Sequence, residues 1–313
     1  MKNNIQIAIL DDYQNVALTC ADWSVLSEMA GITVYNDHQD QESAIVARLL
    51  PFQVICVMRE RTPLSGSMLR QLPNLKLLVS TGPRNHSIDH ETAAELGIII
   101  KNTGYVSSGA PELTWSLLLA AARHIPQETH NLRSGKWQST IGKDLSSRTI
   151  GIIGLGNIGA KIAVYAKAFD MKILAWSPNL TEDTAQAAGA LKVTKEQLFS
   201  ESDFITIHVP LNASSRGLVS VTELNLMKPA AILINTSRGP IVNEAALINA
   251  LTNNQIAGAV LDVFDVEPLD AGHPYTHLPN VIATPHIGYV TEDTYQVFYG
   301  DTVKAITEWI SEN

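Results

Sequence analysis

The sequence predicts an α/β protein with two doubly wound parallel sheets in series. Three observations predict this class. Short apolar runs alternate with helical patterns in the first third of the chain, and the same alternation restarts at residue 149. A length of 313 residues also corresponds to about two domains. Strands separated by helical crossovers form parallel sheets, and strands buried on both faces read as continuous apolar runs.

The first domain is expected to be built from four buried strands and the helices between them. Helical spacing occurs at 42–50 and 89–97, and 110–125 is predicted to be one long buried helix with Pro111 in its first turn. The four strands are expected from short runs rich in β-branched residues and Leu, at 5–10, 53–58, 75–80 and 97–102.

The second domain is expected to be fuller, with six strands. Helical segments at 157–170 and 243–253 lie between apolar runs, and 291–311 is an amphipathic helix. The six expected strands are 149–153, 172–177, 203–209, 230–237, 256–264 and 280–285.

Composition narrows the function classes. A net charge of −9 argues against a nucleic-acid surface, which needs clustered Lys and Arg. No apolar run approaches the roughly 20 residues that span a bilayer, and the N-terminal segment lacks a signal-peptide pattern. Cys20 and Cys56 are the only cysteines and form neither a disulfide framework nor a metal spacing. We expect a soluble, cytoplasmic protein without a bound metal, nucleic-acid partner or membrane partner.

A glycine motif follows the strand expected at 149–153. Gly154, Gly156 and Gly159 have G-x-G-x-x-G spacing and are followed by a helical pattern. The first glycine allows a tight turn, the second lets backbone amides approach a pyrophosphate, and the third lets the helix pack on the strand. The helix N-terminus adds unpaired donors and a positive dipole end. The sequence therefore predicts a dinucleotide site.

The residues that choose between NAD and NADP are ambiguous. An acidic residue for the ribose hydroxyls is usual about 20 residues after the glycines, but this chain has Ser177, Pro178 and Asn179 there. No carboxylate is present to repel a 2′-phosphate, and no Arg or Lys is present to hold one. NAD is favoured, and NADP is not excluded.

Three polar side chains of complementary chemistry follow three expected strands. Arg238 follows 230–237, Glu267 follows 256–264, and His286 follows 280–285. Taken singly, they suit a surface Arg, a solvated Glu and a structural His. Ligands bind outside the carboxyl ends of parallel strands, so together the three are expected to face one site.

The chemistry of the three residues suits reduction of a 2-oxo acid. A nicotinamide supplies a hydride for the carbonyl carbon, and His286 supplies a proton for its oxygen. Glu267 favours the imidazolium and orients the ring. Arg238 can hold the substrate carboxylate through two hydrogen bonds, which lysine cannot do.

With these residues in place, the sequence resembles the D-isomer-specific 2-hydroxyacid dehydrogenases, the family of D-3-phosphoglycerate dehydrogenase, glycerate dehydrogenase and hydroxypyruvate/glyoxylate reductases. The similarity rests on "GLGNIG", "NTSRGPIVNEAAL", "LDVFDVEP" and "TPHIG", in that order along nearly the whole chain. The resemblance implies that Arg238, Glu267 and His286 are catalytic. It also implies D-stereochemistry, which no spacing argument gives.

The resemblance implies further cofactor contacts. Asn157 and Ile158 are expected at the pyrophosphate, Val209 on the adenosine side, and Thr236 and Asp262 near the nicotinamide. His208 is expected either to stabilise a turn or to contact the cofactor. The remaining cofactor contacts expected are Ser177, Pro210, Gly288 and Thr81.

The substrate loop is expected at "STGPRN". Thr81 and Gly82 match the family loop that offers backbone amides to the substrate carboxylate, and Thr81 also matches a cofactor contact. Pro83 departs from the family pattern and removes one donor. Arg59, with Arg61 and Arg84, is expected either to hold a distal anion such as a phosphate or to pair with Glu60 and Asp89. Without that anion, glyoxylate, hydroxypyruvate or glycerate is an equally suitable substrate.

Family architecture implies that a Rossmann domain (102–287) is inserted in a flavodoxin-like substrate domain (1–101 and 288–313), with the active site between them. Family members are usually homodimers, and "LRSGKW" (132–137) resembles their dimer-contacting arm. The alternative function is an NAD(H)-sensing, corepressor-like binding module with little turnover, as some relatives with the same three residues are.

Overall fold

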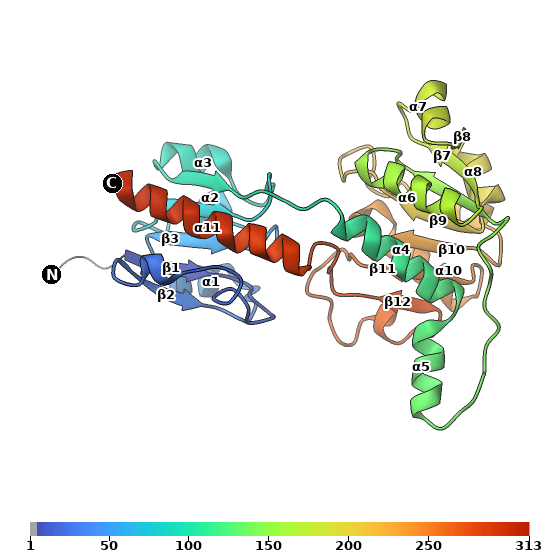
Figure 1. The fold of residues 1–313 in the computed structure, drawn as a ribbon, viewed down its shortest axis with the longest axis horizontal. Helices are drawn as coiled ribbons and strands as arrows, with labels where there is room; N and C mark the ends of the chain where they lie inside the picture. Colours follow the sequence, from blue (N-terminus) through green and yellow to red (C-terminus); the bar gives the residue numbers. More distant parts are fainter. Residues whose placement is uncertain (1–4, 313) are drawn as a thin grey trace. The chain divides into compact units, whose positions relative to one another are not determined.

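The computed structural model describes residues 5–312 and divides the chain into two compact units (Figure 1). Unit 1 contains the described residues up to Val106 and from Val290 onward, and unit 2 is Ser107–Tyr289. The boundaries expected from the sequence fall after residues 101 and 287. Residues 1–4, where the segment without a signal-peptide pattern begins, lie outside the described residues.

Unit 1 is built on a five-stranded parallel sheet with the order β2-β1-β3-β4-β5. This is the flavodoxin-like order, in which β1 and β3 flank the switch point. The strands are β1 Ile5–Ile9, β2 Ala30–Val34, β3 Val54–Val57, β4 Leu77–Ser80 and β5 Ile99–Asn102. The helices are η1 Ser24–Leu26, α1 Glu42–Leu49, α2 Gly66–Leu69, α3 His90–Glu95 and α11 Glu292–Glu312.

The core of unit 1 forms where helices cover buried strands. β3 and β4 are buried along their whole length, as their continuous apolar sequences predict. One cluster joins Ile55 and Leu78 of these strands to Leu49 of α1 and Met68 of α2. The C-terminal helix α11, red in Figure 1, packs on β4 and η1, so both ends of the chain build this unit.

Unit 2 is built on a seven-stranded parallel sheet with the order β12-β11-β10-β9-β6-β7-β8. The strands are β6 Thr149–Ile153, β7 Lys172–Trp176, β8 Leu191–Lys192, β9 Phe204–Ile207, β10 Ile232–Asn235, β11 Gly258–Leu261 and β12 Val281–Ala283. The helices are α4 Gly109–Ala122, α5 Ile125–Arg133, α6 Asn157–Ala168, α7 Glu182–Ala187, α8 Lys195–Glu201, α9 Val221–Leu226, η2 Gly239–Ile241, α10 Glu244–Thr252 and η3 Pro274–Thr276.

Helices cover both faces of the sheet in unit 2. Alternate strand residues point to opposite faces, so Ile152 joins the cluster under α4 and α6, whereas Ile153 joins the cluster under α8, α9 and α10. Figure 1 shows α4 and α6 side by side, and they are in contact. The result is the three-layer arrangement of a doubly wound fold.

Three local features differ from the sequence expectations. The helix expected over 110–125 ends at Ala122, and His124, at φ 51°, turns the chain into α5, which has Pro126 in its first turn. The exposed two-residue β8 and the half-exposed β2 were not anticipated. Among the described residues, no helix is both long and apolar enough to cross a bilayer.

Candidate active site

Sheet order brings the three predicted catalytic segments together. Arg238, Glu267 and His286 follow β10, β11 and β12, and these strands are consecutive neighbours in the sheet of unit 2. Because the strands are parallel, all three segments begin at the same carboxyl edge. The same edge carries the glycine loop after β6 and Val209 after β9.

His286 and Glu267 are in direct contact. The His286 Nδ1 atom lies 2.5 Å from Glu267 Oε2, and the Phe264 amide donates to Glu267 Oε1 at 2.9 Å. Each side chain of the pair is about one-third exposed, 28% for His286 and 33% for Glu267, so the pair is accessible to a small molecule. A carboxylate at Nδ1 places a proton on that atom and leaves Nε2 for a substrate.

The backbone holds His286 in an uncommon conformation. Its φ is 52°, in the left-handed region, and its amide donates to the Thr284 carbonyl at 2.9 Å across Pro285. Its ring also meets the Tyr289 ring edge-on at 5.7 Å. Such conformations occur where the surroundings over-determine them, often at functional sites.

Asp262 anchors the segment that carries His286. It is 1% exposed and accepts hydrogen bonds from the Thr284 hydroxyl at 2.6 Å, the Ile287 amide at 2.9 Å and the Gly288 amide at 3.0 Å. Burial raises the pKa of Asp262, although these donors oppose the shift. Asp262 therefore fixes the turn on both sides of His286.

The Arg238 segment packs directly on the Glu267 loop. A Cβ atom on Gly239 would collide with the backbone of Phe264 and Asp265, so only glycine permits this approach. Arg238 itself has an extended backbone, and its Nη1 donates to the Ser237 carbonyl at 2.8 Å. The Asn235 side chain holds the Arg238 carbonyl at 2.9 Å.

The glycine loop has the geometry that a dinucleotide requires. Gly154 has a φ of +93°, and a Cβ there would lie 2.7 Å from the His208 carbonyl oxygen. A Cβ on Gly159 would collide with the Gly154 carbonyl, so α6 packs tightly on the loop. No side chain caps α6, and the space around the Cβ position of Gly156 is open. The residues present therefore fit a pyrophosphate at the helix N-terminus, beside Asn157 and Ile158.

Other predicted cofactor residues lie at neighbouring strand ends. Thr236 Oγ1 is 2.7 Å from Thr114 Oγ1, and Val209 accepts a hydrogen bond from Ser237 Oγ at 2.6 Å. Pro210 is exposed beside Val209. His208 Nε2 lies 2.9 Å from Thr206 Oγ1, and burial lowers the His208 pKa to about 3, so the ring is neutral.

The edge beyond β7 carries acidic side chains. Ser177, Pro178 and Asn179 follow the strand, and the Leu180 amide closes a turn onto the Ser177 carbonyl at 3.2 Å. Helix α7 then begins with Glu182 and Asp183, both exposed. Residues 177–183, from the end of β7 into the first turn of α7, include two carboxylates and no Lys or Arg.

The predicted substrate loop lies in unit 1, and its amides are engaged there. The Thr81 amide donates to the Val57 carbonyl at 3.1 Å, and the Gly82 amide donates to Thr103 Oγ1 at 2.7 Å. Pro83 has no N–H. In this structure, therefore, none of these three residues presents an unengaged amide to a carboxylate.

The three candidate arginines of unit 1 are not equivalent. Arg59 has a φ of 52°, and its Nη1 donates to the Thr81 carbonyl at 3.1 Å. Arg61 donates to the Asp11 carbonyl at 2.6 Å and lies 4.5 Å over the Tyr13 ring, so it ties two loops together. Arg84 is exposed. Arg59 is therefore the arginine from another segment whose guanidinium hydrogen-bonds to the predicted substrate loop.

Neither the close packing of Gly239 nor the anchoring by Asp262 was predicted from the sequence; the expected position of Asp262 near the nicotinamide stays a prediction. The available signal was that Gly239 is the glycine of the "SRG" motif, but the backbone on which it packs, at Phe264 and Asp265, lies far along the chain. Across residues 5–312, no group of three or more His, Cys, Asp or Glu is arranged to hold a metal ion.

A parallel sheet with a glycine loop and a His–Glu pair at its carboxyl edge defines unit 2 as the dinucleotide domain of an oxidoreductase. The family model described as "D-isomer specific 2-hydroxyacid dehydrogenase, NAD binding domain" matches residues 115–288. The chain belongs to the D-isomer-specific 2-hydroxyacid dehydrogenase family, and its cofactor is NAD. The family and the fold predicted from the sequence are confirmed.

Individual relatives agree with this assignment. The chain is 39% identical over 237 residues to the glyoxylate reductase of Aeropyrum pernix, covering 72% of this chain and 71% of the relative. It is 36% identical over 267 residues to the hydroxypyruvate reductase of Thermotoga maritima, covering 84% and 86%. The crystal structure of a phosphoglycerate oxidoreductase from Vibrio cholerae superimposes with a TM-score of 0.93 at 35% identity, covering 99% and 100%. The chain spans about half the length of the curated D-3-phosphoglycerate dehydrogenases it matches.

Proposed function

We propose that this chain interconverts a small D-2-hydroxy acid and its 2-oxo acid with NAD, using His286, Glu267 and Arg238. The observation that carries the proposal is the 2.5 Å contact between His286 Nδ1 and Glu267 Oε2 at the carboxyl edge of the dinucleotide sheet. NADH supplies a hydride to the carbonyl carbon when it is bound. His286 Nε2 gives its proton to the carbonyl oxygen, and Glu267 stabilises the imidazolium before that transfer.

Arg238 is assigned to the substrate carboxylate. Its guanidinium can donate two parallel hydrogen bonds to a carboxylate, which fixes the direction of the adjoining carbonyl group. In the oxidation direction, neutral His286 would accept the hydroxyl proton, and bound NAD⁺ would take the hydride from the carbon that bears that hydroxyl. The substrate contacts of Thr81 and Gly82 remain predictions, and a contact to the Gly82 amide would have to displace the Thr103 hydroxyl.

The candidate substrates are glyoxylate, the pair hydroxypyruvate and glycerate, and the pair phosphohydroxypyruvate and 3-phosphoglycerate. The test follows NADH oxidation with each of the three 2-oxo acids, glyoxylate, hydroxypyruvate and phosphohydroxypyruvate, and repeats it with NADPH. Brisk turnover of at least one acid supports the proposal. Tight NADH binding without turnover of any acid would instead favour the NAD(H)-sensing module.

NAD is proposed to be preferred over NADP. Glu182 and Asp183 lie in the first turn of α7, which begins after the five-residue segment 177–181 that follows β7, the strand at whose end dinucleotide folds bind the adenosine ribose. Two carboxylates there repel a 2′-phosphate, and Lys192, the nearby cation, is 3.7 Å from Glu182. We expect a higher kcat/KM with NADH than with NADPH in the same assay.

Arg59 is proposed to bind the distal group of a phosphorylated substrate. Arg59→Ala should then lower kcat/KM for phosphohydroxypyruvate by roughly ten- to a hundredfold, the value of about 1.5–3 kcal/mol for a charge-assisted hydrogen bond. Glyoxylate, which has no distal group, should be affected much less. Equal losses for the two substrates would remove the anion-site role, and Arg84→Ala serves as the exposed control.

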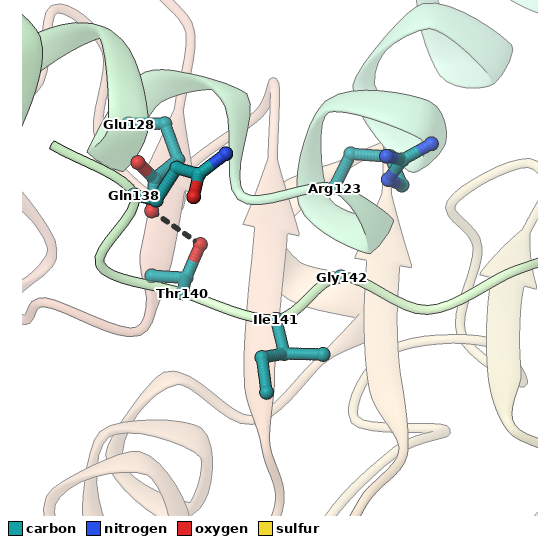
Figure 2. Close-up of a pocket in the computed structure, with 6 residues that line it drawn as sticks. All are labelled: Arg123, Glu128, Gln138, Thr140, Ile141 and Gly142. Carbon is teal, nitrogen blue, oxygen red and sulfur yellow. Dashed lines mark hydrogen bonds between the residues drawn. The ribbon is translucent and has the colours of Figure 1, made fainter.

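A homodimer is proposed from the segment that follows α5. Glu128 holds this segment by accepting hydrogen bonds from Ser139 and, at 2.6 Å, from the Thr140 hydroxyl; Figure 2 shows the contact with Thr140. Both Glu128 and Thr140 line a cavity of about 390 Å³. This segment nevertheless exposes two large apolar residues to solvent: Trp137 is 77% exposed and Ile141 is 93% exposed. Such side chains on a fixed segment suit burial against a second copy of the chain.

Light scattering is expected to give about twice the chain mass of 34.0 kDa. Trp137→Asp with Ile141→Asp should shift the protein towards the monomer, because two charges cannot be buried unpaired in an apolar interface. Val221→Asp, an equally polar change at an exposed residue in the first turn of α9, should not. A wild-type mass near 34.0 kDa would contradict the dimer.

A further inference from the structure

A second histidine–carboxylate contact lies in the loop that carries Glu267. This loop connects β11 to β12 over residues 262–280 and contains only the short η3. Its near end is held by Gly239 packing on Phe264 and by the Phe264 amide on Glu267 Oε1. Its far end continues into β12, so the middle of the loop, around η3, has to be held by other contacts.

His273 makes those contacts. Its Nδ1 accepts the Tyr275 amide at 3.3 Å, and its Nε2 lies 3.4 Å from Oε2 of Glu244, the first residue of α10. Because Nδ1 is an acceptor, the ring proton is on Nε2, where it faces the carboxylate. The side chain is only 18% exposed, and its ring lies 4.8 Å from the Tyr275 ring.

Tyr275 links His273 back to the start of the loop. It is 5% exposed, and its ring lies 6.3 Å from the ring of Phe264, whose amide holds Glu267. A continuous series of side-chain and backbone contacts therefore leads from Glu244 through His273 and Tyr275 to Phe264 and Glu267. Glu244 begins the helix that follows the Arg238 segment, so the contact joins the two predicted catalytic segments at a second place.

We infer that His273 is a positioning residue, which acts through Glu244 and Tyr275 to hold Glu267 against His286. The inference rests on the proposed function, because its kinetic consequence requires Glu267 to assist His286. Its structural consequence, a fixed Phe264 amide, does not require activity.

The charged groups around His273 suit this role. Glu244 faces it from α10, and Asp265 faces it from its own loop, where burial and the nearby Glu244 raise the Asp265 pKa. Arg216, on the segment after β9, opposes that shift. The imidazole therefore interacts with the carboxyl groups of Glu244 and Asp265, and its Nε2 is the atom that lies 3.4 Å from Glu244.

The test compares His273→Ala, Glu244→Gln and His273→Asn in the full-length chain, with exposed His277→Ala as the matched control in the same loop. We expect His273→Ala to lower kcat roughly ten- to a hundredfold, the size of effect that follows from small misplacement of a reacting group. The NADH Kd should not change. His273→Asn keeps an acceptor for the Tyr275 amide and should recover part of the loss.

Two readouts separate positioning from a merely structural role. The pH–rate profile for reduction should change in His273→Ala, because the proton donor His286 loses its contact with the Glu267 carboxylate. Hydrogen exchange at the Phe264 amide should become faster, with or without turnover. A drop in thermal stability alone, with the pH profile and Phe264 exchange unchanged, overturns the inference.

Failure of the inference is distinguishable from failure of the proposed function. If the wild type reduces a 2-oxo acid and His273→Ala matches it in kcat and pH profile, only the inference is wrong. If the wild type turns over no acid, the proposed function is wrong, and Phe264 exchange still decides whether His273 holds Glu267.

Discussion

His286→Asn is expected to lower kcat for 2-oxo acid reduction by about 10²- to 10⁴-fold, the range that a positioned general acid contributes. Asparagine is the informative replacement because it tolerates the left-handed backbone that His286 adopts at φ 52°. Its side-chain amide can still donate to Glu267, so the local hydrogen bond persists. What is removed is the titratable nitrogen that faces the substrate.

The measurement is single-turnover and steady-state reduction at several pH values, with NADH affinity determined separately by fluorescence. NADH binding should be unchanged, because His286 follows β12 and the glycine loop follows β6, and these two strands are four positions apart in the sheet order. Glu267→Gln, which keeps the shape but loses the charge, should fall between the wild type and His286→Asn. Retention of most of the activity in His286→Asn would falsify the assignment of His286 as the acid.

Much of the fold could be predicted because its strands are buried on both faces. Val54–Val57 and Ile232–Asn235 read as continuous apolar runs, which few other structures explain. β8 escaped prediction because Leu191–Lys192 is two exposed residues at a sheet edge. The end of α4 escaped because the apolar pattern continues to Ile125 although the backbone turns at His124.

The site was predictable in residue type and less so in its contacts. Arg238, Glu267 and His286 could be identified as complementary groups after strands, but their meeting depends on β10, β11 and β12 being neighbours, which crossover topology decides. The Gly82 amide donates a hydrogen bond to the Thr103 hydroxyl, and Arg61 donates one to the Asp11 carbonyl. In both cases the acceptor is distant in sequence from the donor. No local pattern encodes such pairings.

The same reason explains why His273 was overlooked. In the sequence it is one polar residue in a loop of Asp, Gly and Pro, and such loops are ordinarily solvated. Its partner Glu244 begins α10, which precedes β11 in the chain, and only the fold brings the two side chains to 3.4 Å. Functional motifs are visible locally, whereas the contacts that hold them in place are made between distant segments.

Arg238→Ala is expected to lower kcat/KM for a 2-oxo acid by roughly 30- to 4000-fold, which corresponds to the loss of about 2–5 kcal/mol when one partner of a desolvated charge pair is removed. Arg238→Lys should recover only a small part of this loss, because an ammonium is a point charge and cannot make two parallel hydrogen bonds to a carboxylate. The extended backbone at Arg238 suits any residue except proline, so neither replacement strains the loop.

The comparison that decides the role of Arg238 uses substrates with and without a carboxylate beside the carbonyl group. If Arg238 binds that carboxylate, the variants should lose most of the preference of the wild type for glyoxylate over a simple aldehyde, while the NADH Kd stays the same. The neighbouring Gly239 packs on the Phe264 backbone whatever the side chain at 238, so the Glu267 loop should keep its place. An equal loss for both substrates would show that Arg238 supports the loop instead of the substrate, and would leave the carboxylate to be bound by another donor.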